Sequence, residues 1–89
     1  MNLEQLSVKY QKEIEEKGLH TADGVNKAGV MTYLNLVTDI QNVLEVLVWA
    51  CQFKKFVKTH DEARGIVHHA SMPVQKKLMQ AILDLKCLS

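Results

Sequence analysis

The four histidines of this 89-residue chain are the first residues whose chemistry could indicate a metal site. His60 and His68 would lie about 12 Å apart along a helix, too far for two ligands of one ion. His68 and His69 are adjacent and would point in different directions. The sequence has no His-Glu-x-x-His motif and no Cys/His pair at ligand spacing. We expect no bound metal, and we interpret His60, Arg64 and His68 as a polar helix face.

Paired carboxylates are the second candidate. Glu13 and Glu16 would share one helix face. A helical, magnesium-dependent nucleotide-processing enzyme would need several such pairs on two helices, because Mg²⁺ takes oxygen ligands from converging carboxylates. The following segment offers only Asp39 and Glu45, whose spacing does not bring them together. We interpret these acids as solvated charge and rank such an enzyme last among three candidate functions.

Other catalytic patterns are missing from the sequence. It has no supporting Ser/His/Asp or Cys/His arrangement and no glycine-rich phosphate loop. We therefore expect that the protein is not an enzyme and binds no cofactor. Cys51 and Cys87 are too few for a disulfide framework, so we interpret them as reduced thiols, with Cys51 in the core.

Charge and hydropathy limit the partners and the location. The net charge is only +1, which indicates no general attraction to nucleic acid or membrane. Residues 1–45 hold seven acids and four bases, whereas residues 46–89 hold three acids and seven bases, a difference that favours contact between two copies. We expect no signal peptide and no membrane span, since the central apolar run is interrupted by Asp39, Glu45 and Lys54. The chain should be cytoplasmic.

A nucleic-acid-binding alternative rests on residues 60–86. This segment could form a helix-turn-helix, with Gln75, Lys76, Lys77 and Gln80 beginning a recognition helix. The turn lacks the usual glycine, and a basic helix face is most often solvated surface. A DNA-binding regulator is therefore the second candidate function, and we do not favour it.

The elements that must position these residues are organised around the apolar stretch 30–57. Its polar residues recur at intervals of three, four or seven, which is one narrow stripe on a helix and no face of a strand. They are Asn35, Thr38 or Asp39, Asn42, Glu45 and Gln52. The spacing predicts one long, mostly buried helix that begins between Asp23 and Asn26 and runs to about Val57.

Three shorter helices surround this stretch. Asn2 and Gln5 form a capping box for the first, which Gly18 ends in a Schellman motif. Thr59 and Glu62 form a second capping box, so a new helix begins there. The last helix runs from Pro73 towards Leu88, because proline fits the first turn of a helix and not its interior.

Helix length predicts the assembly. A helix from about Lys27 to Val57 would be about 46 Å long, whereas a compact chain of this size is only about 31 Å across. Apolar residues follow such a helix on two sides, and the chain can cover only one of them. We therefore predict a single all-α domain spanning residues 1–89. It would be a four-helix, bundle-like domain with a long, mostly buried central helix, forming a homodimer or higher oligomer.

The function that follows is a non-catalytic interaction module, a small adaptor or inhibitor that self-associates and binds another protein. Trp49 falls in the polar stripe of the long helix, where a solvent-facing residue is expected. Either Lys and Gln side chains of a neighbouring helix cover it, or it is an anchor at a subunit or partner contact, which we favour. The predicted protein-interaction residues are Glu45, Trp49, Gln52, Phe53 and Phe56.

Overall fold

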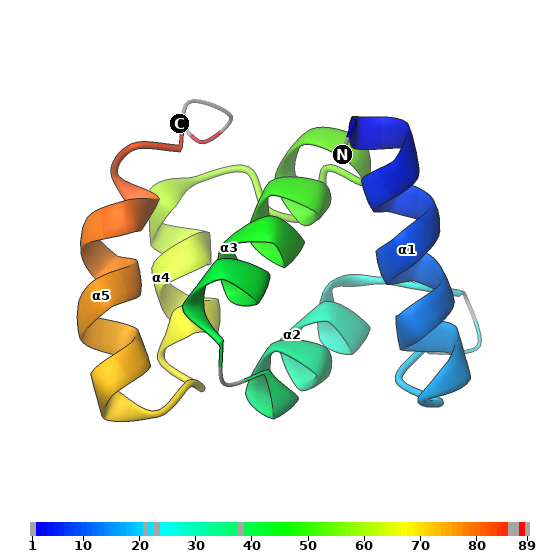
Figure 1. Ribbon diagram of the computed structural model, residues 1–89, viewed down its shortest axis with the longest axis horizontal. Helices are drawn as coiled ribbons and strands as arrows, with labels where there is room; N and C mark the ends of the chain where they lie inside the picture. The colour runs from blue at the N-terminus through cyan, green and yellow to red at the C-terminus, as the bar shows by residue number, and fades with distance from the viewer. Residues whose placement is uncertain (1, 21, 23, 38, 86–87, 89) are drawn as a thin grey trace.

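The computed structural model of the chain describes residues 2–20, 22, 24–37, 39–85 and 88, so Asp23, Thr38 and Cys87 lie outside the described residues. This part of the chain forms five α-helices and one π-helical turn, with no β-strand (Figure 1). The elements are α1 (Leu3–Glu16), α2 (Lys27–Leu36), α3 (Ile40–Val48), the π-helical turn η1 (Trp49–Phe53), α4 (His60–Val67) and α5 (Met72–Ile82). The predicted all-α class is confirmed, with five α-helices where four were expected.

Local signals at both ends of α1 act as the sequence predicts. The Gln5 N–H donates to Asn2 Oδ1 over 2.8 Å, and the Asn2 N–H donates to Gln5 Oε1 over 3.2 Å. At the other end Gly18 adopts φ +67°, and the Leu19 N–H donates to the Ile14 carbonyl over 3.0 Å. Both ends therefore satisfy backbone groups that a helix terminus leaves free.

The predicted long helix is wrong, because the chain leaves helical geometry between α2 and α3. Val37 is extended at φ −92° and ψ 123°, and Asp39 begins the next helix as its N-cap. Asp39 Oδ1 accepts the Gln41 N–H over 2.8 Å and the Asn42 N–H over 3.4 Å. A short acidic side chain that accepts hydrogen bonds from nearby backbone N–H groups competes with the continuation of a helix. Asp39 therefore starts a new helix and is not part of the polar side of one long helix.

The second half of the stretch also departs from a regular helix. α3 passes directly into η1, where the Lys54 N–H donates to the Trp49 carbonyl over 3.2 Å. Lys55 then adopts φ 59°, and the Phe56 N–H closes the end by donating to the Ala50 carbonyl over 2.8 Å. A residue with positive φ after the last turn is a common way to end a helix, although glycine is the usual occupant.

The last two helices begin where the sequence indicates. Thr59 Oγ1 accepts the Glu62 N–H over 3.1 Å, while the Glu62 carboxylate accepts the Lys58 N–H over 3.2 Å. Ser71 is the N-cap residue of α5, but its side chain makes no capping hydrogen bond. α5 ends at Ile82, six residues short of the predicted end, and Leu83 is its C-cap.

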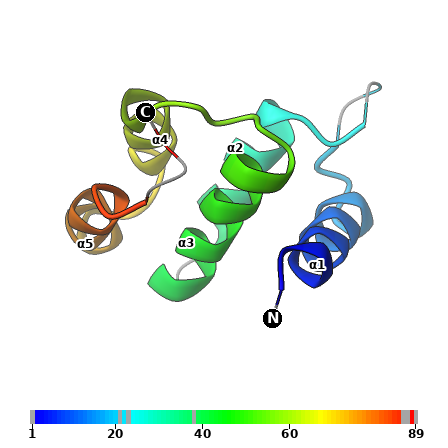
Figure 2. The ribbon, with the colours of Figure 1, turned by 90° about the horizontal axis from the view of Figure 1, so that it is seen from above.

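The helices pack into one globule with α2 and α3 between α1 and the α4–α5 pair (Figures 1 and 2). η1 packs on α1, α2 contacts α4, and α3 contacts α5. The radius of gyration is 11.9 Å and the extents are 31 × 24 × 22 Å. The core consists of Leu6, Tyr10, Ile14, Val30, Tyr33, Leu34, Val43, Val46, Leu47, Trp49, Ala50, Cys51, Val57, Ala63, Ile66, Val67, Val74, Leu78, Ile82 and Leu88. Since the broken helix fits inside a single chain, its length no longer supports an oligomer.

Gly29, in the first turn of α2, allows another segment of the chain to pack closely against that turn. A Cβ built on Gly29 would lie 2.2 Å from the Leu19 carbonyl oxygen, so the segment after α1 passes directly over the first turn of α2. Only a residue without a side chain permits this approach. The Asn26 side chain accepts the Gly29 N–H over 3.2 Å and caps the same turn.

Hydropathy along the helices agrees with the interrupted pattern of the sequence. Within the described ranges, no helix combines the length and the apolar character that crossing a bilayer requires.

Candidate functional site

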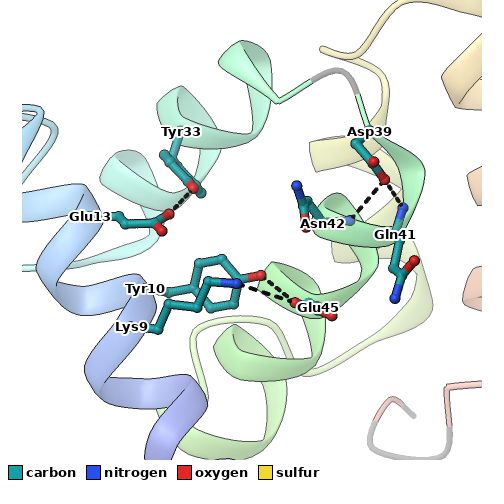
Figure 3. A network of polar contacts seen from close by, with 8 residues as sticks. All are labelled: Lys9, Tyr10, Glu13, Tyr33, Asp39, Gln41, Asn42 and Glu45. Carbon is teal, nitrogen blue, oxygen red and sulfur yellow. Dashed lines mark hydrogen bonds and ion pairs between the residues drawn. The ribbon is translucent and has the colours of Figure 1, made fainter. Parts of the chain in front are cut away.

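The first polar constellation joins α1 to α3. The Tyr10 hydroxyl donates to the Glu45 carboxylate over 2.6 Å, and Lys9 Nζ lies 3.8 Å from the same carboxylate oxygen (Figure 3). Lys9 Nζ also lies 4.9 Å from the centroid of the Tyr10 ring, within reach of a cation–π interaction. Glu45 therefore faces a neighbouring helix that supplies both a donor and a cation.

A matching constellation joins α1 to α2. The Tyr33 hydroxyl donates to the Glu13 carboxylate (Figure 3), and Lys17 Nζ lies 4.8 Å from the centroid of the Tyr33 ring. The rings of Tyr10 and Tyr33 meet edge to face, with their centroids 6.2 Å apart. Two groups of Tyr, Glu and Lys thus attach α1 to the helices beside it.

The surroundings of the two tyrosines favour their protonated form. Burial raises the pKa of Tyr10 above its ordinary value, and the hydrogen bond and charge of Glu45 raise it further. Burial and Glu13 raise the pKa of Tyr33 in the same way. Both hydroxyls therefore stay protonated at neutral pH and act as hydrogen-bond donors. The two hydrogen bonds attach α1 to α3 and to α2.

The expectation that Trp49 faces solvent is wrong. Its side chain is 0% exposed, with its ring centroid 6.3 Å from both Tyr10 and Phe56. The side of α3 that carries Glu45 packs against α1, where the Tyr10 hydroxyl donates to Glu45, and the Glu45 side chain stays 36% exposed. Trp49 is a core residue in this fold and cannot contact a partner from inside it.

The other predicted interaction residues do not share one surface environment. Gln52 and Phe53 are exposed at the end of η1, whereas Phe56 is half-buried against Trp49. Glu45 is held by Tyr10 and Lys9. A partner role for the four residues other than Trp49 remains a prediction.

An exposed apolar row on α5 was missed by sequence reasoning. Met72 and Leu83 are 62% and 63% exposed, and Met79 lies between them at the edge of the core. Their separations of seven and four residues place them on one side of the helix, turned away from the buried Val74 and Leu78. That spacing was the available signal. Lys76 and Gln80 lie on the same side and give it a polar character in the sequence.

The charged and polar side chains beside this row do not cover it. Lys76 and Lys77 are exposed, and α5 contains no acidic residue. Gln75 Nε2 donates to the carbonyls of His68 and Ala70, over 2.8 and 2.6 Å, so its side chain is held against the turn that follows α4. It is therefore not available to cover the apolar row.

Concave surfaces elsewhere are shallow. One depression of about 240 Å³ lies where the segment after α1 crosses α2, beside Gly18 and Gly29. A second depression of about 240 Å³ lies along α1 itself, beside Val8 and Glu15. Within the described part of the chain, no group of three or more His, Cys, Asp or Glu side chains is placed to hold a metal ion.

Comparison with known proteins assigns the chain to no family. The chain matches no protein-family model, no curated protein and no solved structure.

Proposed function

We propose that this protein is a non-catalytic, α-helical interaction module that binds another macromolecule through the outer side of α5. The observation that carries the proposal is the row of Met72, Met79 and Leu83, in which two large side chains are more than half exposed. Single exposed apolar residues are ordinary on protein surfaces, but two exposed residues on one side of a helix with the partly buried Met79 between them form an apolar row that a partner can cover. Methionine also adapts to varied apolar partners.

The energetic gain from covering this row is appreciable. Full burial of one large apolar side chain contributes roughly 1.5–3 kcal/mol relative to leaving it in water.

Site-specific photo-crosslinking in cell extract tests the proposal. A photoreactive residue at position 83 should capture a discrete partner, and Met72→Glu should abolish that capture while the circular dichroism spectrum stays unchanged. Val8 on α1 is the matched control, because it is 66% exposed but has no apolar neighbours in line. Equal capture from positions 8 and 83 would show nonspecific adhesion and refute the proposed surface.

Self-association is retained as a separate proposal with weaker support. Helix length no longer requires it, and the uneven charge of the two halves is what remains in its favour. Sedimentation at micromolar concentration should show a species heavier than the 10.1 kDa monomer, and the weight should fall as salt screens the charges. We further propose that the module acts in the cytoplasm.

DNA binding by α4 and α5 has less support than binding of a protein. Lys76 and Lys77 give α5 a basic side, as the alternative requires. However, α4 and α5 lie side by side and run in opposite directions (Figures 1 and 2), whereas a helix-turn-helix needs two helices that cross. Duplex DNA binding that weakens steeply with salt would favour this alternative.

A further inference from the structure

The apolar row on α5 has the spacing of a helix-pairing seam. Met72, Lys76, Met79 and Leu83 follow one another at intervals of four, three and four residues. This is the alternation of d and a positions by which two helices pack side chains between each other. Leu83 belongs to the seam because it keeps helical backbone angles, φ −61° and ψ −25°. The seam is about 16 Å long, enough for about three turns of a partner helix.

Lys76 decides which helix the seam can accept. It is exposed, occupies an a position between apolar residues, and is followed by a second exposed lysine, Lys77. A lysine at such a position tolerates a partner that offers a carboxylate and disfavours one that offers another cation. α5 provides no acid of its own to neutralise it.

We propose that this face binds an amphipathic, acidic helix of another protein. The partner would lay apolar side chains on Met72, Met79 and Leu83 and place a carboxylate beside Lys76. This inference rests on the proposed function and names the chemistry of the partner.

A second copy of the chain fits the seam less well. Two α5 helices paired in parallel would bring Lys76 against Lys76 of the other copy, and an antiparallel pair would place Lys76 opposite a methionine, so neither pairing offers it a carboxylate in the seam. A seam of about three turns also buries much less than the roughly 800 Å² per partner that a stable interface covers. A short acidic helix supplies the carboxylate that Lys76 needs, and the small area of the seam predicts a reversible complex.

The test uses the full chain and two synthetic helices of about three heptads, kept below their own self-association concentration. Both carry leucine at the seam, and they differ only in a glutamate or a lysine opposite Lys76. Calorimetry should show that the glutamate helix binds about tenfold more tightly than the lysine helix, and that Lys76→Glu reverses this preference. Lys77→Glu makes the same charge change outside the seam and should leave the preference in place.

Each other outcome overturns the proposal. Equal affinity for the two helices, or the same effect from Lys76→Glu and Lys77→Glu, would show general charge attraction. Sedimentation of a dimer that Leu83→Glu dissociates would assign the seam to a second copy. Binding to phosphatidylserine vesicles that Leu83→Glu abolishes would assign it to a membrane surface. If neither helix binds but position 83 still crosslinks a protein, only the acidic-helix inference fails; if crosslinking also fails, the proposed function fails with it.

Discussion

The inner side of α1 carries polar side chains towards neighbouring helices, whereas the outer side of α5 carries apolar side chains towards solvent. Tyr10 and Glu13 of α1 each have a polar partner on a neighbouring helix: Tyr10 donates to Glu45, and Glu13 accepts from Tyr33. α5 presents Met72 and Leu83 to solvent. The polar groups of Tyr10 and Glu13 therefore have hydrogen-bond partners within the chain.

This difference separates structural features from features that call for a partner. A polar group inside costs little once it is hydrogen-bonded, so the α1 network needs nothing more to be stable. An apolar row outside costs little in folding but gains free energy only when something covers it. The α1 network is therefore a source of stability, whereas α5 is where we expect binding. Four predictions test this division, from the largest expected effect to the smallest.

Trp49→Ala should lower the free energy of unfolding by about 3–5 kcal/mol, because truncating a fully buried tryptophan leaves a cavity in the core. Urea denaturation followed by circular dichroism measures the loss. Phe53→Ala is the control, since Phe53 is 41% exposed and should cost much less. A native-like midpoint for Trp49→Ala would contradict the buried position and return Trp49 to the surface.

Gly29→Ala should cost about 2 kcal/mol, because its Cβ would overlap the Leu19 carbonyl and force the backbone apart. Gly65→Ala is the matched change in α4, where no atom lies within 4 Å of the added Cβ. That variant should be more stable by about 0.5–1 kcal/mol, since alanine favours a helix over glycine. Thermal unfolding of both variants checks the opposite signs, and equal effects would refute the close approach at Gly29.

Tyr10→Phe and Tyr33→Phe should each cost about 1–2 kcal/mol, because each removes a hydrogen bond to a carboxylate that is only partly exposed. The same network predicts a pH effect. Above about pH 10, the ordinary pKa of tyrosine, the unfolded chain loses protons that the folded chain keeps. The free energy of unfolding should therefore be fully retained below pH 10 and fall as the pH rises beyond it.

Denaturation of the wild type and the double Phe variant across this pH range isolates the tyrosine contribution from that of the lysines. The wild type should lose stability with the steeper slope. Parallel slopes would mean that the tyrosines are not held as protonated donors in the folded state.

Met72→Ser and Leu83→Ser should change the free energy of unfolding by no more than about 0.5 kcal/mol, as expected for exposed positions. The same denaturation measurement checks this, with Leu78→Ser as the buried control on α5. A loss of several kcal/mol from Leu83→Ser would show that the row is already covered within the chain, and the contrast with α1 would disappear.

Short-range signals in the sequence determine where most helices begin and end. The Asn2 and Gln5 capping box, Gly18, Thr59 and Pro73 each act on backbone groups a few residues away, so their effect is readable without knowledge of the fold. Apolar composition likewise determines the all-α class and most of the core. Asp39 carried the same kind of signal, but its fit to a helical period concealed its role as a cap.

Only tertiary structure decided which face of each helix is covered. A sequence shows that Glu45 is polar but does not show that Tyr10, 35 residues away, supplies its hydrogen bond. Trp49, on the same side as Glu45, is likewise covered by α1, where its ring lies 6.3 Å from that of Tyr10. The converse holds for Leu83, whose apolar side chain predicts burial but is mostly exposed. Hydrogen bonding and packing between distant segments set these outcomes, and periodicity within one segment carries no information about them.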